Sequence, residues 1–172
     1  MILIDLFHFI ETGEFGSVTV GMTHNEVKTI LGDPDDWTGF NIMDDAFIWT
    51  YGSIRLVFRD NLYGIMTDDF PLQGGHSIVF DNWLLEWYLS LGELETVLKR
   101  REIPYILETL EFDRYDTTLR RKVTITNLRV AITNSNVWLL FHQPESEKMT
   151  SLLDADNFYL TGFGVVARDD TD

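Results

Sequence analysis

The chain has 172 residues, of which 45% are hydrophobic and 24% charged, and this balance excludes an intrinsically disordered protein. It contains no cysteine, which excludes disulfides, zinc–thiolate centres, iron–sulfur clusters and thiol nucleophiles. Its net charge of −15 disfavours binding to nucleic acid or to an anionic membrane and favours basic partners.

The acidic charge is unevenly distributed along the chain. Residues 1–98 hold 16 acidic and 3 basic side chains, for a net charge of −13. Residues 99–130 hold 5 acidic and 8 basic side chains, for a net charge of +3, and residues 131–172 have a net charge of −5. The N-terminal half is therefore expected to present an acidic surface.

The N-terminal stretch is apolar, but it has no basic n-region, and Asp5 and His8 interrupt the run, so no signal peptide is expected. No segment approaches the roughly 20 apolar residues of a membrane-spanning helix, and we expect a cytoplasmic protein. The apolar spacing of Leu3, Leu6 and Ile10 predicts an N-terminal helix of about ten residues.

The clearest local signal lies between Gly21 and Pro34. Thr23 and Glu26 have the T-x-x-E spacing of a capping box, in which each side chain bonds the backbone N–H of the other residue. Gly32 can take the left-handed conformation at a helix C-terminus, and Pro34 prevents continuation. A short helix with both ends specified is expected here.

An antiparallel meander is predicted after an acidic, aromatic loop that follows Pro34. Its strands are expected at 46–51, 54–59 and 62–66, because apolar residues alternate there and the turns Gly52-Ser53 and Asp60-Asn61 separate them.

The second half of the chain repeats part of this pattern. Ser90 and Glu93 give a second capping box at an offset of 67 residues from the first, and Pro104 ends the helix that follows. Strands are expected at 105–112, 123–125, 128–132 and 137–141, with a bulge or turn at Asn127, and a last short helix or strand within 149–166.

These signals predict an α+β fold in which helices pack on one face of an antiparallel sheet built from two related helix-plus-meander halves. We place the first half at residues 1–70 and a linker at 71–76. The second half, with a longer insertion, occupies 77–167, and 168–172 form an acidic tail.

The motif Leu31-Gly32-Asp33-Pro34 after a capped helix, followed by Trp49-Thr50-Tyr51-Gly52, resembles the SmpA/OmlA-type module and the related β-lactamase inhibitor protein. It is also similar to immunity proteins of bacterial polymorphic toxin systems. The resemblance covers about residues 14–66, with a weaker match over 89–141. The lipobox cysteine and the disulfides of those relatives are absent. The resemblance implies a tandem cytosolic module that binds a protein and catalyses no reaction.

No catalytic or metal-binding motif is found. The four histidines (His8, His24, His76 and His142) lack metal-ligand spacing, and His24 is expected to be exposed and without a partner. The acidic clusters do not match a calcium loop. We predict no catalytic residues, no metal and no cofactor.

We predict an immunity or inhibitor protein that blocks a basic toxin domain and is itself a monomer or weak homodimer. In the segment after the first helix, carboxylates would steer association and aromatic rings would anchor the partner. Alternatively, the aromatic rings only cap the core. The predicted binding residues are Asp33, Asp35, Asp36, Trp37, Phe40, Asp44 and Asp45.

Two other functions stay open at this point. One is a small ligand-binding or catalytic domain with a cleft between the halves, where carboxylates would converge with His24, His76 or His142. The other is a structural adaptor that dimerises through its sheet.

Overall fold

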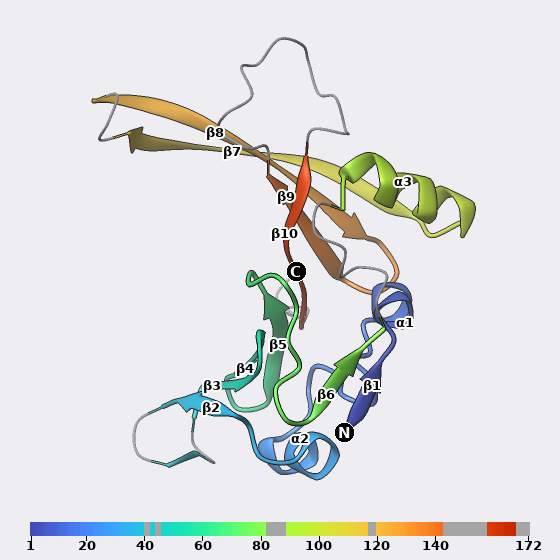
Figure 1. Ribbon diagram of the computed structural model, residues 1–172, viewed down its shortest axis with the longest axis vertical. Coiled ribbons are helices and arrows are strands. Elements are labelled where there is room, and N and C mark those ends of the chain that lie inside the picture. Colours follow the sequence, from blue (N-terminus) through green and yellow to red (C-terminus); the bar gives the residue numbers. More distant parts are fainter. Residues whose placement is uncertain (40–41, 44–45, 82–88, 117–119, 143–157, 168–172) are drawn as a thin grey trace.

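The computed structural model describes residues 1–39, 42–43, 46–81, 89–116, 120–142 and 158–167. Its main feature is one eight-stranded antiparallel sheet in the order β2-β3-β4-β5-β10-β9-β8-β7 (Figure 1). The strands are β2 (Asp36–Thr38), β3 (Ile48–Tyr51), β4 (Ile54–Phe58), β5 (Leu62–Thr67), β7 (Tyr105–Asp116), β8 (Arg121–Ile132), β9 (Val137–His142) and β10 (Tyr159–Val166).

The remaining described elements lie on one side of this sheet. They are the helices α1 (Leu6–Thr12), α2 (His24–Leu31) and α3 (Leu91–Arg100), and a small parallel pair of β1 (Ile2–Ile4) with β6 (Ile78–Phe80). The α+β class predicted from the sequence is confirmed. No helix among the described residues is long and apolar enough to cross a membrane.

The four strands of each half of the sheet are preceded in the chain by a helix. In chain order, α2 precedes β2 to β5, and α3 precedes β7 to β10. The last strands of the two sets, β5 and β10, pair with each other at the centre, with Met66 opposite Gly164. The strand order of the second set is therefore the reverse of the first. The boundaries proposed from the sequence stay predictions.

Both capped helices form as expected. The Thr23 hydroxyl accepts a hydrogen bond from the Glu26 N–H, and the Glu26 carboxylate accepts one from the Thr23 N–H. Ser90 and Glu93 make the same reciprocal pair at the start of α3. Each cap satisfies backbone N–H groups that a helix start otherwise leaves unpaired.

The N-terminal helix is shorter than predicted. Asp5 caps it by accepting from the N–H groups of Phe7 and His8, so α1 starts at Leu6. It ends at Thr12, and Gly13, whose φ of 79° is left-handed, caps its C-terminus. Leu3 instead belongs to β1 and is largely exposed. The prediction was wrong at this end because an apolar period does not reveal a capping carboxylate within it.

The predicted meander is confirmed as β3, β4 and β5. The segment after Pro34 was expected to be a loop, but part of it is the edge strand β2, in which Trp37 lies opposite Trp49. The predicted bulge at Asn127 is also wrong, because β8 is continuous there and Asn127 is paired with both Leu110 and His142.

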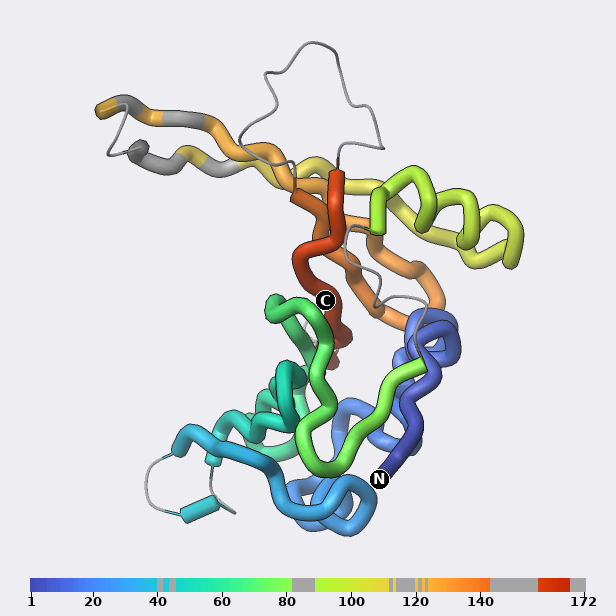
Figure 2. The backbone as a smooth tube through the Cα atoms, in the orientation of Figure 1, coloured from blue at the N-terminus to red at the C-terminus, as the bar shows by residue number. Residues whose placement is uncertain are grey.

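The C-terminal segment ends in a strand, β10. The hairpin of β7 and β8 extends beyond the other strands as a long two-stranded arm (Figures 1 and 2). The predictions for residues 82–88, 143–157 and 168–172 lie outside the described residues.

One hydrophobic core lies between the sheet and the helices. Phe9 of α1 contacts Phe163 of β10, and Trp49 and Phe58 pack edge to face, 5.1 Å apart between ring centroids. All four rings belong to one buried hydrophobic cluster, which extends over both halves of the sheet. The helices therefore bury one side of the sheet.

Candidate functional site

The predicted acidic segment divides into exposed and inward-pointing carboxylates. The Asp33 carboxylate is exposed and pairs with Lys28 Nζ at 2.7 Å. Asp36 is exposed and accepts from the N–H of Trp37. Phe40, Asp44 and Asp45 lie outside the described residues.

Asp35 has a structural role that the sequence did not suggest. Its side chain is only 19% exposed. The Gly52 N–H donates to Oδ2 at 2.7 Å, and both the N–H of His76, at 3.2 Å, and its ring Nδ1 contact Oδ1. Asp35 thereby ties the turn between β3 and β4 to the segment that follows β5.

This environment also changes the acidity of Asp35. Burial alone would raise the pKa of the carboxyl group, but the hydrogen bonds from His76 and Gly52 outweigh burial, so the pKa lies below its ordinary value. Gly75 lies directly against the Asp35 carboxylate. Its φ is +59°, and a Cβ at this position would lie 1.6 Å from Asp35 Oδ2, so no larger residue fits here. No sequence pattern links Asp35 to Gly52 and His76, which lie 17 and 41 residues away from it in the chain.

Trp37 and Asp36 lie on opposite sides of the sheet edge. Trp37 shares a side with the buried Trp49, which is the side packed by the helices, and it is 37% exposed there. Asp36 is opposite Thr50 and therefore lies on the other side. The structure thus separates two residues that the sequence prediction grouped together.

The side of the sheet away from the helices, which we call the open face, is not covered by any described helix or strand (Figure 1). Strand register assigns its members because residues opposite one another in an antiparallel pair share a face. They are Asp36, Thr50, Arg55, Val57, Met66, Gly164, Val166, Trp138, Leu140, Arg129, Ala131, Glu108 and Ile106.

Trp138 lies at the centre of the open face. Its partner on β10 is Gly164, and a Cβ on Gly164 would lie 2.8 Å from Cζ2 of the indole. The missing side chain therefore lets the ring approach the backbone of β10. Met66 is the next residue across the sheet, so a half-buried tryptophan and methionine flank the glycine.

Two ion pairs flank this apolar centre. Arg129 of β8 pairs with Glu108 of β7, with Nη2 and Oε2 2.5 Å apart. Arg55 of β4 pairs with Asp68, which follows β5. All four side chains are more than a third exposed, so the ion pairs contribute little to stability.

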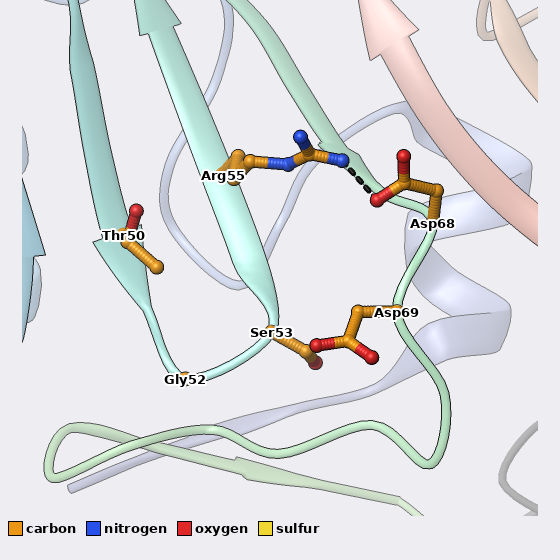
Figure 3. A pocket seen from close by; sticks show the side chains of 6 residues that line it. All are labelled: Thr50, Gly52, Ser53, Arg55, Asp68 and Asp69. Atoms are coloured by element: carbon orange, nitrogen blue, oxygen red, sulfur yellow. Dashed lines mark hydrogen bonds and ion pairs between the residues drawn. The ribbon is translucent and has the colours of Figure 1, made fainter. Parts of the chain in front are cut away.

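A shallow pocket lies beside Arg55 at the end of the meander. Its lining side chains converge from the β3–β4 turn and from the segment after β5, with Arg55 directed at Asp68 (Figure 3). The lining residues are Thr50, Gly52, Ser53, Arg55, Asp68 and Asp69. No histidine belongs to this lining, so the pocket does not match the arrangement expected of the catalytic alternative.

His24 and His142 each make a specific contact within the fold. His24 was expected to be exposed without a partner, and this is wrong, because its Nε2 contacts Ala46 O at 2.8 Å and its ring stacks on Phe58. His142 contacts Asn127 Oδ1 through Nδ1 at 2.7 Å. Within the described part of the chain, no group of three or more histidines and carboxylates could hold a metal ion.

Comparison with known proteins gives no relative for this chain: no family model, no curated protein and no solved structure matches it.

Proposed function

We propose that this chain is a non-catalytic protein-binding module of the immunity or inhibitor type, and that its open face receives a basic protein domain. The observation that carries the proposal is the contrast between the two sides of the sheet. One side packs on the helices, and the other presents Trp138, Met66 and Arg55 to solvent. Tryptophan, methionine and arginine are enriched in protein interfaces, and tryptophan and arginine dominate their binding energy.

The charge of the chain supports a basic partner. The first 98 residues have a net charge of −13. Three of their carboxylates lie on the open face or beside its pocket: Asp36, Asp68 and Asp69. A potential of one sign accelerates encounter with a partner of opposite sign, in a salt-dependent manner. A toxin domain that binds nucleic acid would present such a basic surface.

The first experiment is to identify the partner. Purification of the chain from its native host, together with tests of the proteins encoded next to it, gives candidates whose affinity is measured by titration calorimetry. We then expect Trp138→Ala to weaken binding at least about tenfold, because central aromatic anchors contribute most to such interfaces. Val79→Ala is the control, since Val79 is 41% exposed on β6, on the helix side of the sheet.

A second pair of substitutions tests the electrostatic part. Asp33→Lys with Asp36→Lys should slow association and reduce its dependence on salt, while leaving the fold intact because both carboxylates are exposed. Asp35 is left unchanged in this test because its carboxylate holds the fold. If an identified partner binds with the same affinity after Trp138→Ala and after the double substitution to lysine, it binds elsewhere, and the proposal fails.

A further inference from the structure

The shallow pocket beside Arg55 is held in shape by two buried hydroxyl groups. The Ser53 hydroxyl, on the turn between β3 and β4, accepts from the Gln73 N–H at 2.9 Å. The Thr67 hydroxyl, at the end of β5, donates to Ser53 O at 2.8 Å and accepts from the Asp69 N–H at 3.2 Å. These bonds fix the turn against the segment after β5, so the walls of the pocket are preorganised for a ligand.

The carboxylate of Asp69 is an unpaired charge in this pocket. Arg55 is paired with Asp68, whereas no described residue forms a hydrogen bond or an ion pair with the Asp69 carboxylate. Figure 3 shows this carboxylate directed toward Ser53 on the other wall. The lining therefore has one uncompensated negative charge, and Thr50 adds a hydroxyl group.

The composition of the lining argues against other classes of ligand. Pockets for small molecules are lined mostly by hydrophobic and aromatic side chains, and no such side chain lines this pocket. An anion would be repelled by Asp69 and would have to displace Asp68 from Arg55. The described residues bring no three histidines or carboxylates together for a divalent metal ion. A single organic cation fits the lining best.

The pocket and the apolar centre of the open face belong to one row of the sheet. Arg55 of β4 lies opposite Met66 of β5. In the same row, Gly164 of β10 lies between Met66 and Trp138 of β9. Three strand spacings separate β4 from β9, which places the pocket about 14 Å from the indole. A protein domain that covers Trp138 with an interface of ordinary size therefore also reaches the pocket.

We propose that this pocket receives a lysine side chain of the basic partner domain, with the ammonium group bonded to Asp69. The inference rests on the proposed function and assigns the partner a lysine about 14 Å from the surface that covers Trp138. An ammonium group has three donors, which match the Asp69 carboxylate, the second oxygen of Asp68 and the Thr50 hydroxyl. The planar fork of an arginine matches a single carboxylate and suits these separate acceptors less well.

The pocket itself is tested with n-butylammonium as the probe for a lysine side chain. In a heteronuclear NMR titration at constant ionic strength, we expect shifts in the amide signals of Gly52, Ser53 and Asp69. Neutral n-butanol should shift none of them, and n-butylguanidinium should bind less tightly. Asp69→Asn should weaken n-butylammonium binding about fivefold, the upper value for an exposed ion pair. Asp60→Asn is the matched control, since it removes an exposed carboxylate between β4 and β5, at the other end of these strands.

The second measurement uses the partner identified through the open face. Asp69→Asn should weaken its binding at least about tenfold, because a charge pair enclosed by an interface contributes more than an exposed one. Asp60→Asn should leave the affinity unchanged. When the lysines of the partner are replaced one at a time by methionine, one position should show a loss that is not additive with Asp69→Asn.

Four results would overturn the proposal. Amide signals that ignore n-butylammonium, or that respond equally in Asp69→Asn, show that the pocket does not bind an ammonium group. Tighter binding of n-butylguanidinium assigns the pocket to arginine instead. A partner that loses affinity on Trp138→Ala but not on Asp69→Asn uses the open face without the pocket, so this inference fails and the proposed function stands. A partner indifferent to both substitutions contradicts the proposed function, and this inference fails with it.

Discussion

Replacement of Asp35 by asparagine tests whether this carboxylate holds the first half of the sheet together. The amide removes the charge and turns an NH2 group toward one of the two backbone N–H donors, Gly52 and His76. Hydrogen bonds to charged groups are each worth about 1.5–3 kcal/mol. Because the side chain is 19% exposed and water replaces part of the loss, we expect the free energy of unfolding to fall by about 2–3 kcal/mol.

The measurement is urea unfolding at pH 7, followed by the fluorescence of the five tryptophans. For a chain of this size the expected loss corresponds to a decrease of about 5–10 °C in the melting temperature. Asp33→Asn is the matched control. Asp33 is in the same segment, but its carboxylate is 67% exposed, so its ion pair with Lys28 should contribute less than about 0.5 kcal/mol.

The dependence on pH gives a second, independent readout. Because folding lowers the pKa of Asp35, its stabilisation is fully present above the pKa of the unfolded chain, about 3.9, and is lost as the pH falls through the lower folded value. The difference in stability between wild type and Asp35→Asn should therefore shrink below about pH 4. A difference that is the same at pH 3 and pH 7, or that equals the effect of Asp33→Asn, would refute the reasoning.

Two further sets of substitutions probe the local structure. Gly75→Ala should lower the free energy of unfolding by about 3 kcal/mol, through backbone strain and collision with Asp35. Gly21→Ala, where φ is also positive but nothing lies within 4 Å of the new methyl group, should lose only about 1 kcal/mol, and equal losses would contradict the collision. Thr23→Ala and Ser90→Ala should each lower stability by about 1 kcal/mol, more at the buried Ser90, as measured by thermal unfolding; no loss at either would argue against the caps.

Sequence patterns succeeded where the structure depends on near neighbours. The capping boxes at Thr23 and Ser90 join residues three positions apart, and both formed as expected. The meander was recognised because tight turns, such as Gly52-Ser53, interrupt alternating apolar residues. Asp5 shows the limit of such patterns, because its capping role was hidden inside an apolar run.

Part of the candidate site could not be derived from the sequence. The sequence identified the segment after Pro34 as acidic and aromatic. It did not show that Asp35 points inward toward Gly52 and His76 while Asp36 faces the open side. These assignments depend on strand register and on contacts between residues that lie 17 and 41 positions apart. Trp138 was seen only as part of a strand, because the close approach of its ring to the sheet depends on Gly164, which lies opposite it on β10.

The sequence by itself determined the capped helices, the hairpins, the acidic balance and the absence of thiol chemistry, since each follows from composition or from residues close together in the chain. Tertiary structure alone decided that β5 and β10 meet at the centre and that β2 and β7 are left as the edges. Pairing between distant strands depends on which faces are buried together, and no local pattern records this. The open face, on which the proposed function rests, is a consequence of that assembly.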